Sequence, residues 1–111
     1  MVGSGQQKVM AEFYKKVFGK APDMEENGWA GWTVGKGFFG VGEHSAVKGK
    51  SKEPERIMFN LETSDVQGEF KRISEIGAVV VKEPYKMGES WIATFADPDG
   101  NYFHLMTPWK G

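Results

Sequence analysis

The chain of 111 residues contains no cysteine. This absence excludes disulfide bonds, thiolate metal sites and cysteine nucleophiles. No apolar run approaches the roughly 20 residues that a helix needs to cross a bilayer. The first residues, Met1–Gly5, have neither the basic nor the apolar region of a signal peptide. We therefore expect a cytoplasmic protein with no membrane partner.

A charge excess of one sign is also missing. The net charge is −1, from 14 basic and 15 acidic residues, so the net charge provides no electrostatic attraction to nucleic acid or anionic lipid. The only basic run, Lys48–Lys52, has no interleaved aromatic residue and is typical of a solvated loop. Aromatic residues, in contrast, are abundant at 14% of the chain, and we expect some of them to line a concavity.

The first half of the sequence predicts one helix followed by strands. Apolar residues recur on one face of Gln6–Phe18, with Ser4 as a candidate N-cap and Gly19 as the terminating residue. A short extended piece and a hairpin closed by glycines follow, at residues 23–26, Trp29–Val34 and Phe38–Glu43.

The second half repeats this arrangement after a polar, glycine- and lysine-rich segment. We expect residues 1–46 to form a first module, 47–55 a linker and 56–111 a second module of one domain. In the second module, the pattern predicts a helix with strands before and after it. These are a strand at Arg56–Glu62, a helix at Val66–Ile76 with candidate capping side chains at Thr63–Asp65, a strand at Ala78–Lys82, a loop at Glu83–Glu89, and strands at Trp91–Ala96 and Tyr102–Thr107.

One helix per half with antiparallel hairpins indicates an α+β fold, in which a helix covers one face of each sheet. The other face of each sheet also needs a partner, and pairing the halves would curve the sheets around a shared cavity. The two halves match in pattern and not residue by residue.

The last two predicted strands flank Asp97-Pro98-Asp99-Gly100, which is typical of a tight turn. Turn chemistry accounts for both aspartates, so we assign them no catalytic role. The second arm carries His104, whose imidazole is open to three interpretations: a metal ligand, a general base, or a hydrogen-bonded polar side chain without chemistry.

Three segments, Ala11–Gly19, Arg56–Val66 and Asp97–Leu105, together resemble the vicinal oxygen chelate superfamily of glyoxalases, bleomycin-resistance proteins and extradiol dioxygenases. The resemblance implies paired βαβββ modules that form a cup, often in a homodimer. In that family a strand precedes the first helix and usually carries a metal ligand. Only Met1–Gly5 are available here, so the first strand is short, missing, or supplied by strand exchange with a partner chain.

The resemblance also implies positions for metal ligands, most of which this chain does not fill. A histidine often opens the second module, but that position holds Arg56, which offers no lone pair to a metal. His104 matches a ligand position on the last strand and suits zinc, nickel, manganese or iron. Glu43 and His44 lie near a further position without a secure alignment. His104 is thus the only matched candidate, and we assign no complete metal site.

Strand alternation defines a candidate ligand pocket inside the predicted cup. Its candidate ligand-binding residues are Trp32, Arg56, Met58, Asn60, Thr94, Tyr102 and His104. For two of them a simpler interpretation stays open: Arg56 as a surface cation, and Trp32 as a core residue.

These observations support three functions. The first is a bleomycin-resistance-like protein that binds a small aromatic or oxygenated molecule in an apolar cup without a complete metal site. The alternative is a metal-dependent lyase, isomerase or dioxygenase that uses His104 as a ligand. The third is a metal-free enzyme in which His104 is the general base and Arg56 binds an anionic group.

Overall fold

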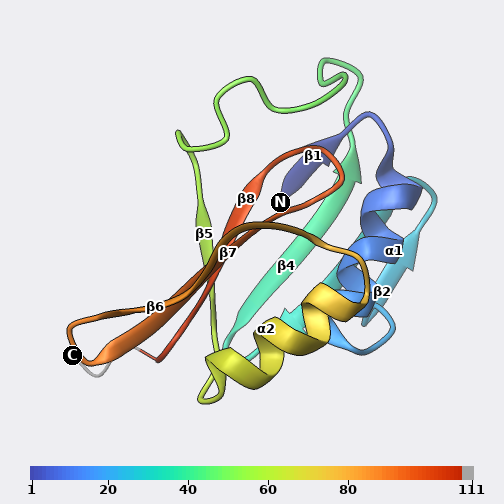
Figure 1. Ribbon diagram of the computed structural model, residues 1–111. Coiled ribbons are helices and arrows are strands. Elements are labelled where there is room, and N and C mark those ends of the chain that lie inside the picture. Colours follow the sequence, from blue (N-terminus) through green and yellow to red (C-terminus); the bar gives the residue numbers. More distant parts are fainter. Residues whose placement is uncertain (109–111) are drawn as a thin grey trace. The chain divides into compact units, whose positions relative to one another are not determined.

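The computed structural model describes residues 1–108, which form two helices and eight strands (Figure 1). The elements are β1 (Val2–Ser4), α1 (Gln7–Phe18), β2 (Met24–Glu26), β3 (Trp29–Val34), β4 (Gly37–Glu43), β5 (Phe59–Glu62), α2 (Val66–Glu75), β6 (Val79–Met87), β7 (Ser90–Ala96) and β8 (Tyr102–Met106). No helix among these residues is long and apolar enough to cross a membrane.

The chain divides into two compact units, Met1–Lys50 and Ser51–Gly111. Each unit has the order β-α-β-β-β, and the two sheets have equivalent strand orders, β1-β4-β3-β2 and β5-β8-β7-β6. In each sheet the first and last strands of the unit pair in parallel, and the other pairs are antiparallel. The predicted α+β fold of paired βαβββ modules is confirmed. The boundary between the units falls in the segment expected to be a linker.

The first strand is present and short. Val2–Ser4 pairs in parallel with β4 of the same chain, with Val2 opposite Val41 and Ser4 opposite Glu43. The predicted role of Ser4 as N-cap is wrong, because Ser4 belongs to the strand and the N-cap is Gln6. The Ser4 hydroxyl instead accepts a hydrogen bond from the Gln6 backbone N–H at 3.0 Å, which fixes the turn between β1 and α1.

Aromatic rings fill the space between α1 and its sheet. Tyr14 of α1 packs on Phe39 with ring centroids 4.7 Å apart, and Phe18 packs on Trp32 at 5.5 Å. Gly19 ends the helix in the left-handed conformation, with φ of 71°, as predicted. This packing occupies the face of β3 and β4 that carries Trp32 and Phe39, and leaves the opposite face without a helix.

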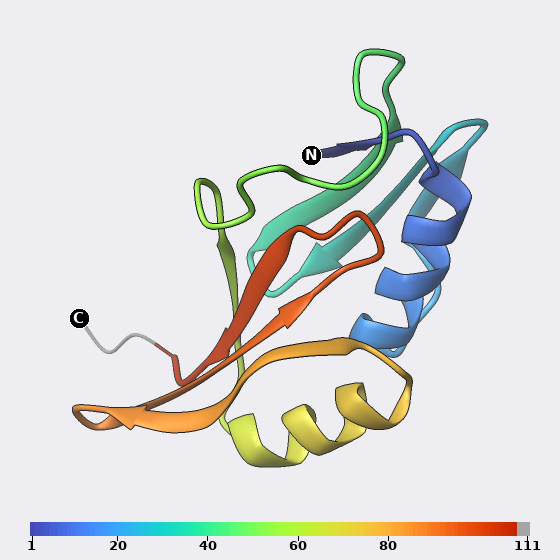
Figure 2. The ribbon, with the colours of Figure 1, turned by 45° about the horizontal axis from the view of Figure 1, so that its top comes forward.

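The second unit is built in the same way. Asp65 caps α2, and its carboxylate accepts a hydrogen bond from the Gly68 N–H at 3.0 Å. Phe70 of α2 stacks on Phe95 of β7 at 5.2 Å, and Phe95 stacks on Phe103 of β8 at 5.7 Å. Figure 2 shows α2 running beside the strands of its own sheet. The helix therefore covers the face that carries Phe95 and Phe103.

Two strand boundaries in the second unit differ from the sequence prediction by more than one residue. β5 begins at Phe59 and not at Arg56, because the Arg56 N–H bonds to the Glu53 carbonyl in a turn. β6 continues to Met87 through the predicted loop. Pro84 is tolerated there because β6 is an edge strand, and its pairing with β7 shifts register between Lys82 and Tyr85.

Candidate functional site

The helix-free face of the second sheet carries a row of polar residues, one from each strand. Asn60 of β5 lies opposite His104 of β8. His104 also lies opposite Thr94 of β7 on its other side, and Thr94 lies opposite Lys82 of β6. Directly opposed residues project from the same face of a sheet. We call these four residues the polar row.

His104 is the centre of the polar row. Its Nδ1 lies 2.7 Å from the Thr94 hydroxyl oxygen, a short hydrogen bond between neighbouring strands. Burial lowers the pKa of the His104 imidazole below its ordinary value. The ring is therefore neutral at neutral pH.

A neutral imidazole with one engaged nitrogen has a defined chemical role. Since Thr94 holds Nδ1, the Nε2 atom is the one left to meet a ligand. It accepts a hydrogen bond when Nδ1 carries the proton and donates one when the Thr94 hydroxyl donates to Nδ1. His104 can thus recognise either a hydroxyl or a carbonyl, and in the first state it can accept a proton.

Apolar residues flank the polar row on the same strands. Ile92 lies opposite Met106, two residues beyond Thr94 and His104, and Tyr102 lies opposite Ala96 on the other side. The amino group of Lys82 lies 5.1 Å from the centre of the Tyr85 ring. A few polar groups among apolar side chains are typical of small-molecule sites.

The structure brings together only some of the predicted ligand-binding residues. Asn60, Thr94 and His104 are direct neighbours, and Tyr102 lies two residues from His104 on the same strand face. Met58 precedes β5 and is exposed.

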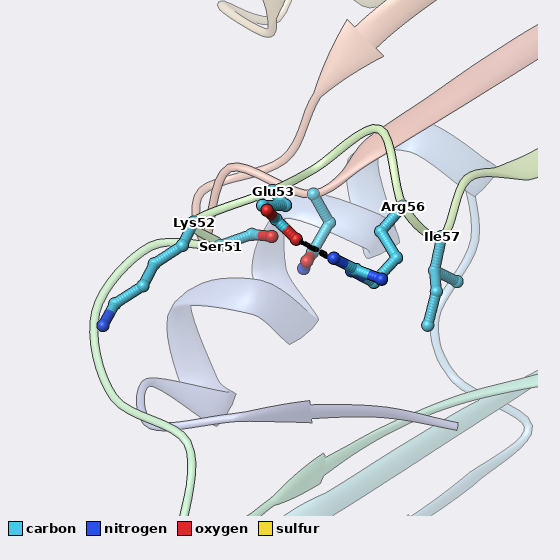
Figure 3. A pocket seen from close by; sticks show the side chains of 6 residues that line it. Ser51, Lys52, Glu53, Arg56 and Ile57 are labelled. Atoms are coloured by element: carbon cyan, nitrogen blue, oxygen red, sulfur yellow. Dashed lines mark hydrogen bonds and ion pairs between the residues drawn. The ribbon is translucent and has the colours of Figure 1, made fainter.

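Arg56 lies in the loop before β5 and outside the polar row. Its guanidinium forms an exposed ion pair with Glu53, three residues earlier, with Nε 2.8 Å from the carboxylate. Both residues line an open surface hollow of about 580 Å³ (Figure 3). Arg56 therefore does not share a strand face with Asn60, as the predicted strand at Arg56–Glu62 would place it.

Trp32 is a core residue of the first unit. Its side chain is 0% exposed, and its indole N–H donates to the Lys20 carbonyl at 3.0 Å. Phe18 and Phe39 pack against the ring. No surface of Trp32 is left for a ligand, so the core interpretation holds.

The residues around His104 do not fit a metal site. Its neighbours in the row, Asn60 and Thr94, are neutral and are weak ligands for a transition metal. Across residues 1–108, no group of three or more His, Asp or Glu side chains is placed to hold a metal ion. A metal centre that uses His104 would need ligands from outside this group.

The turn before His104 has the structural role that its sequence predicts. The Asp97 carboxylate accepts hydrogen bonds from the backbone N–H groups of Asp99 and Asn101 at 3.0 and 2.9 Å. Gly100 has φ of 80° and donates to the Asp97 carbonyl at 2.8 Å. This network fixes the start of β8 and so the position of His104.

Sequence reasoning missed Lys82 as a member of the polar row. Alternation along Ala78–Lys82 does not reveal which residue opposes Thr94, because β6 shifts register against β7 at two points. The available signal was the unbroken β-branched run before Lys82, which indicates a strand but not its register.

Comparison with known proteins gives a consistent result. Residues 3–106 match the sequence profile of the glyoxalase-like domain. No protein with a curated description matches the chain. Similar solved structures include the hypothetical protein SA1046 from S. aureus, with 22% identity, a TM-score of 0.75 and coverage of 97% of this chain and 92% of that one.

Two further structures share the fold. A glyoxalase/bleomycin resistance protein from Catenulispora acidiphila has 19% identity and a TM-score of 0.75, covering 97% of this chain and 94% of that one. The fosfomycin resistance protein FosX from Mesorhizobium loti has 16% identity and a TM-score of 0.74, covering 99% and 92%. At these identities the likeness concerns the fold.

Proposed function

Since this chain belongs to the glyoxalase-like domain family, within the vicinal oxygen chelate superfamily, we propose that it binds a small aromatic or oxygenated molecule at the polar row. The observation that carries the proposal is the hydrogen bond of 2.7 Å between Thr94 and His104 Nδ1. This bond orients the imidazole and reserves Nε2 for a ligand oxygen. Asn60 adds an amide on one side of the ring, and Lys82 adds a cation on the far side of Thr94.

Binding accounts for the row better than metal-dependent chemistry does. The metal-dependent lyase, isomerase or dioxygenase needs about three protein ligands, and the row supplies one imidazole beside neutral groups. The metal-free enzyme keeps His104 as its base but loses Arg56 as the nearby anion-binding group, since Arg56 pairs with Glu53. We therefore favour binding without a metal as the primary function.

The two histidines allow a direct test by NMR. We expect the ring resonances of His104 to shift in a saturable way when catechol, salicylate or lactate is added. His44, whose Nδ1 accepts from the Ala46 N–H, serves as the internal control. His104→Ala assigns the signal and should weaken binding about tenfold, because the ligand loses one hydrogen bond to a half-buried polar group.

Other outcomes of this experiment would contradict the proposal. If no member of a broad aromatic and oxygenated panel shifts His104, the row is not the ligand site. Addition of zinc, nickel, manganese or iron discriminates the alternative. One equivalent of metal bound per chain, lost in His104→Ala, would favour the metal-dependent enzyme.

We further propose that the protein forms a homodimer. Val79, Val80 and Val81 are exposed on β6, which is an edge strand of the second sheet as residues 1–108 form it. An exposed apolar edge is readily covered by another strand. β1 already pairs within its own chain, so the dimer needs no strand exchange. Sedimentation velocity should give a mass twice that of the monomer. The Val80→Lys substitution should lower the measured mass toward that of the monomer.

A further inference from the structure

The helix-free face of the first sheet carries two stacked aromatic rings. Trp29 of β3 and Phe38 of β4 have ring centroids 5.7 Å apart and planes inclined by 18°. Strand alternation places both on the face opposite Trp32 and Phe39, which pack beneath α1. The Phe38 side chain is 52% exposed. We call this pair the aromatic platform.

Glycines beneath the platform let the rings lie close to the backbone. A Cβ atom at Gly31 would lie 2.6 Å from Trp29 Cη2 and would also overlap the Phe38 ring. Cβ atoms at Gly40 and Gly42 would each lie 3.1 Å from the Trp29 indole. A Cβ atom at Gly42 would also lie 2.8 Å from Met1 Sδ, so the Met1 side chain lies beside the Trp29 indole, whereas at Gly31 and Gly40 the rings lie against backbone.

The platform also carries a polar group that the fold does not use. Within residues 1–108 the structure gives the Trp29 indole N–H no hydrogen-bond acceptor. The Trp32 indole N–H, in contrast, donates to the Lys20 carbonyl at 3.0 Å. Trp29 can thus contribute a ring face for stacking and a donor at the ring edge.

We propose that the aromatic platform binds a planar, uncharged or cationic aromatic ring of a small molecule by stacking. Aromatic rings prefer offset-stacked or edge-to-face contacts with one another, so two near-parallel rings offer a stacking surface to a flat aromatic ring. Glu26, directly opposite Trp29 on the same face, is the one charged side chain on that face of β2, β3 and β4. Its carboxylate disfavours an anionic ring and favours a cationic one.

This inference deepens the proposed function and rests on it only in taking a small molecule as the ligand. Two probes of the same outline test it: 2-naphthol, which is planar, and decahydro-2-naphthol, which is not. The readout is the indole N–H resonance of each of the four tryptophans. Trp29→Leu assigns its signal, and Trp32, which is buried and hydrogen-bonded, is the internal control.

We expect 2-naphthol to shift the Trp29 resonance saturably and to leave Trp32 unchanged. Decahydro-2-naphthol should bind at least about threefold more weakly, because it offers no ring face. Phe38→Leu should weaken 2-naphthol binding and, as a smaller change than Trp29→Leu, keeps the test valid if the latter fails to fold. Equal binding of both probes, or no shift of Trp29, would overturn the inference.

Two glycine variants provide a matched test of the platform geometry. Gly31→Ala should displace both rings and reduce 2-naphthol binding, whereas Gly37→Ala, whose Cβ would meet only the Val34 carbonyl at 3.5 Å, should not. Equal effects would contradict the inference. A shift of His104 without one of Trp29 would overturn the platform and leave the proposed function standing. A shift of Trp29 without one of His104 would support the platform and show that 2-naphthol does not bind at the polar row.

Discussion

At the scale of single residues, His104 shows how environment sets chemistry. The residue was identifiable from sequence because it follows a turn that only a few residue types can form. Its partner Thr94 was expected on the same face, and the hydrogen bond of 2.7 Å joins the two. The sequence did not predict that Arg56 lies outside the polar row, because its position depends on a turn formed with Glu53 before the strand begins.

The lowered pKa of His104 predicts a dependence of stability on pH. Burial disfavours the imidazolium in the folded state, so the folded pKa lies below the unfolded value of about 6.5. Between these two values the unfolded chain binds more protons. The free energy of unfolding should therefore fall as pH falls below about 6.5, and this contribution is fully present above it.

Urea unfolding of the wild type and His104→Gln at several pH values between 7.5 and 5 measures this effect. Other titrating groups cancel in the difference between the two proteins. We expect the stability of the wild type relative to the variant to decrease on acidification. A difference that stays constant, or grows, would show that the folded protein does not disfavour the charged ring.

At the scale of elements, local signals predicted both helices well. Gly19 ends α1 and Asp65 caps α2 because these roles depend on backbone geometry within one turn. The edge strand β6 was predicted too short. Its continuation through Pro84 depends on pairing with β7, which residues near Pro84 do not encode. Trp29 and Trp32 differ in role for the same reason, since the position of α1 decides which face becomes core.

The cap of α2 predicts a coupling between two residues. A Cβ at Gly68 would overlap the Asp65 carboxylate, so Gly68→Ala must displace the capping group. The gain from replacing a helical glycine, up to about 1 kcal/mol, should then be offset by loss of a cap worth about 1 kcal/mol. In the Asp65→Ala background the cap is already gone, and Gly68→Ala should stabilise by the full gain.

A double-mutant cycle by urea unfolding measures this coupling. Gly68→Ala should change the free energy of unfolding of the wild type by less than about 0.5 kcal/mol. The same substitution should stabilise the Asp65→Ala variant by about 1 kcal/mol. The same stabilisation in both backgrounds would mean that the Asp65 side chain moves aside at no cost.

At the scale of the whole molecule, the two halves of the sequence share a pattern of helix and strands without matching residue by residue. This pattern predicted two modules because each helix needs a sheet to cover, and each sheet has one face left over. The repeated pattern did not predict the parallel pairing of β1 with β4. Three residues carry no periodicity, and the strand forms only because β4 presents a free edge to it.

The boundary between the two units predicts where the native chain is first cut by trypsin. Residues 44–58 contain neither helix nor strand, and Lys48, Lys50 and Lys52 are all exposed there. The Ser51 N–H donates to the Asp99 carbonyl at 2.7 Å, which holds the chain next to Lys50. Cleavage requires the backbone to extend in the protease, so the bond after Lys48 should be cut first.

Mass spectrometry should find fragments 1–48 and 49–111 early. Lys48→Gln should slow the cut, whereas Lys36→Gln in the hairpin turn should not. An earlier cut within β6 would mean that this edge strand opens more readily than the loop.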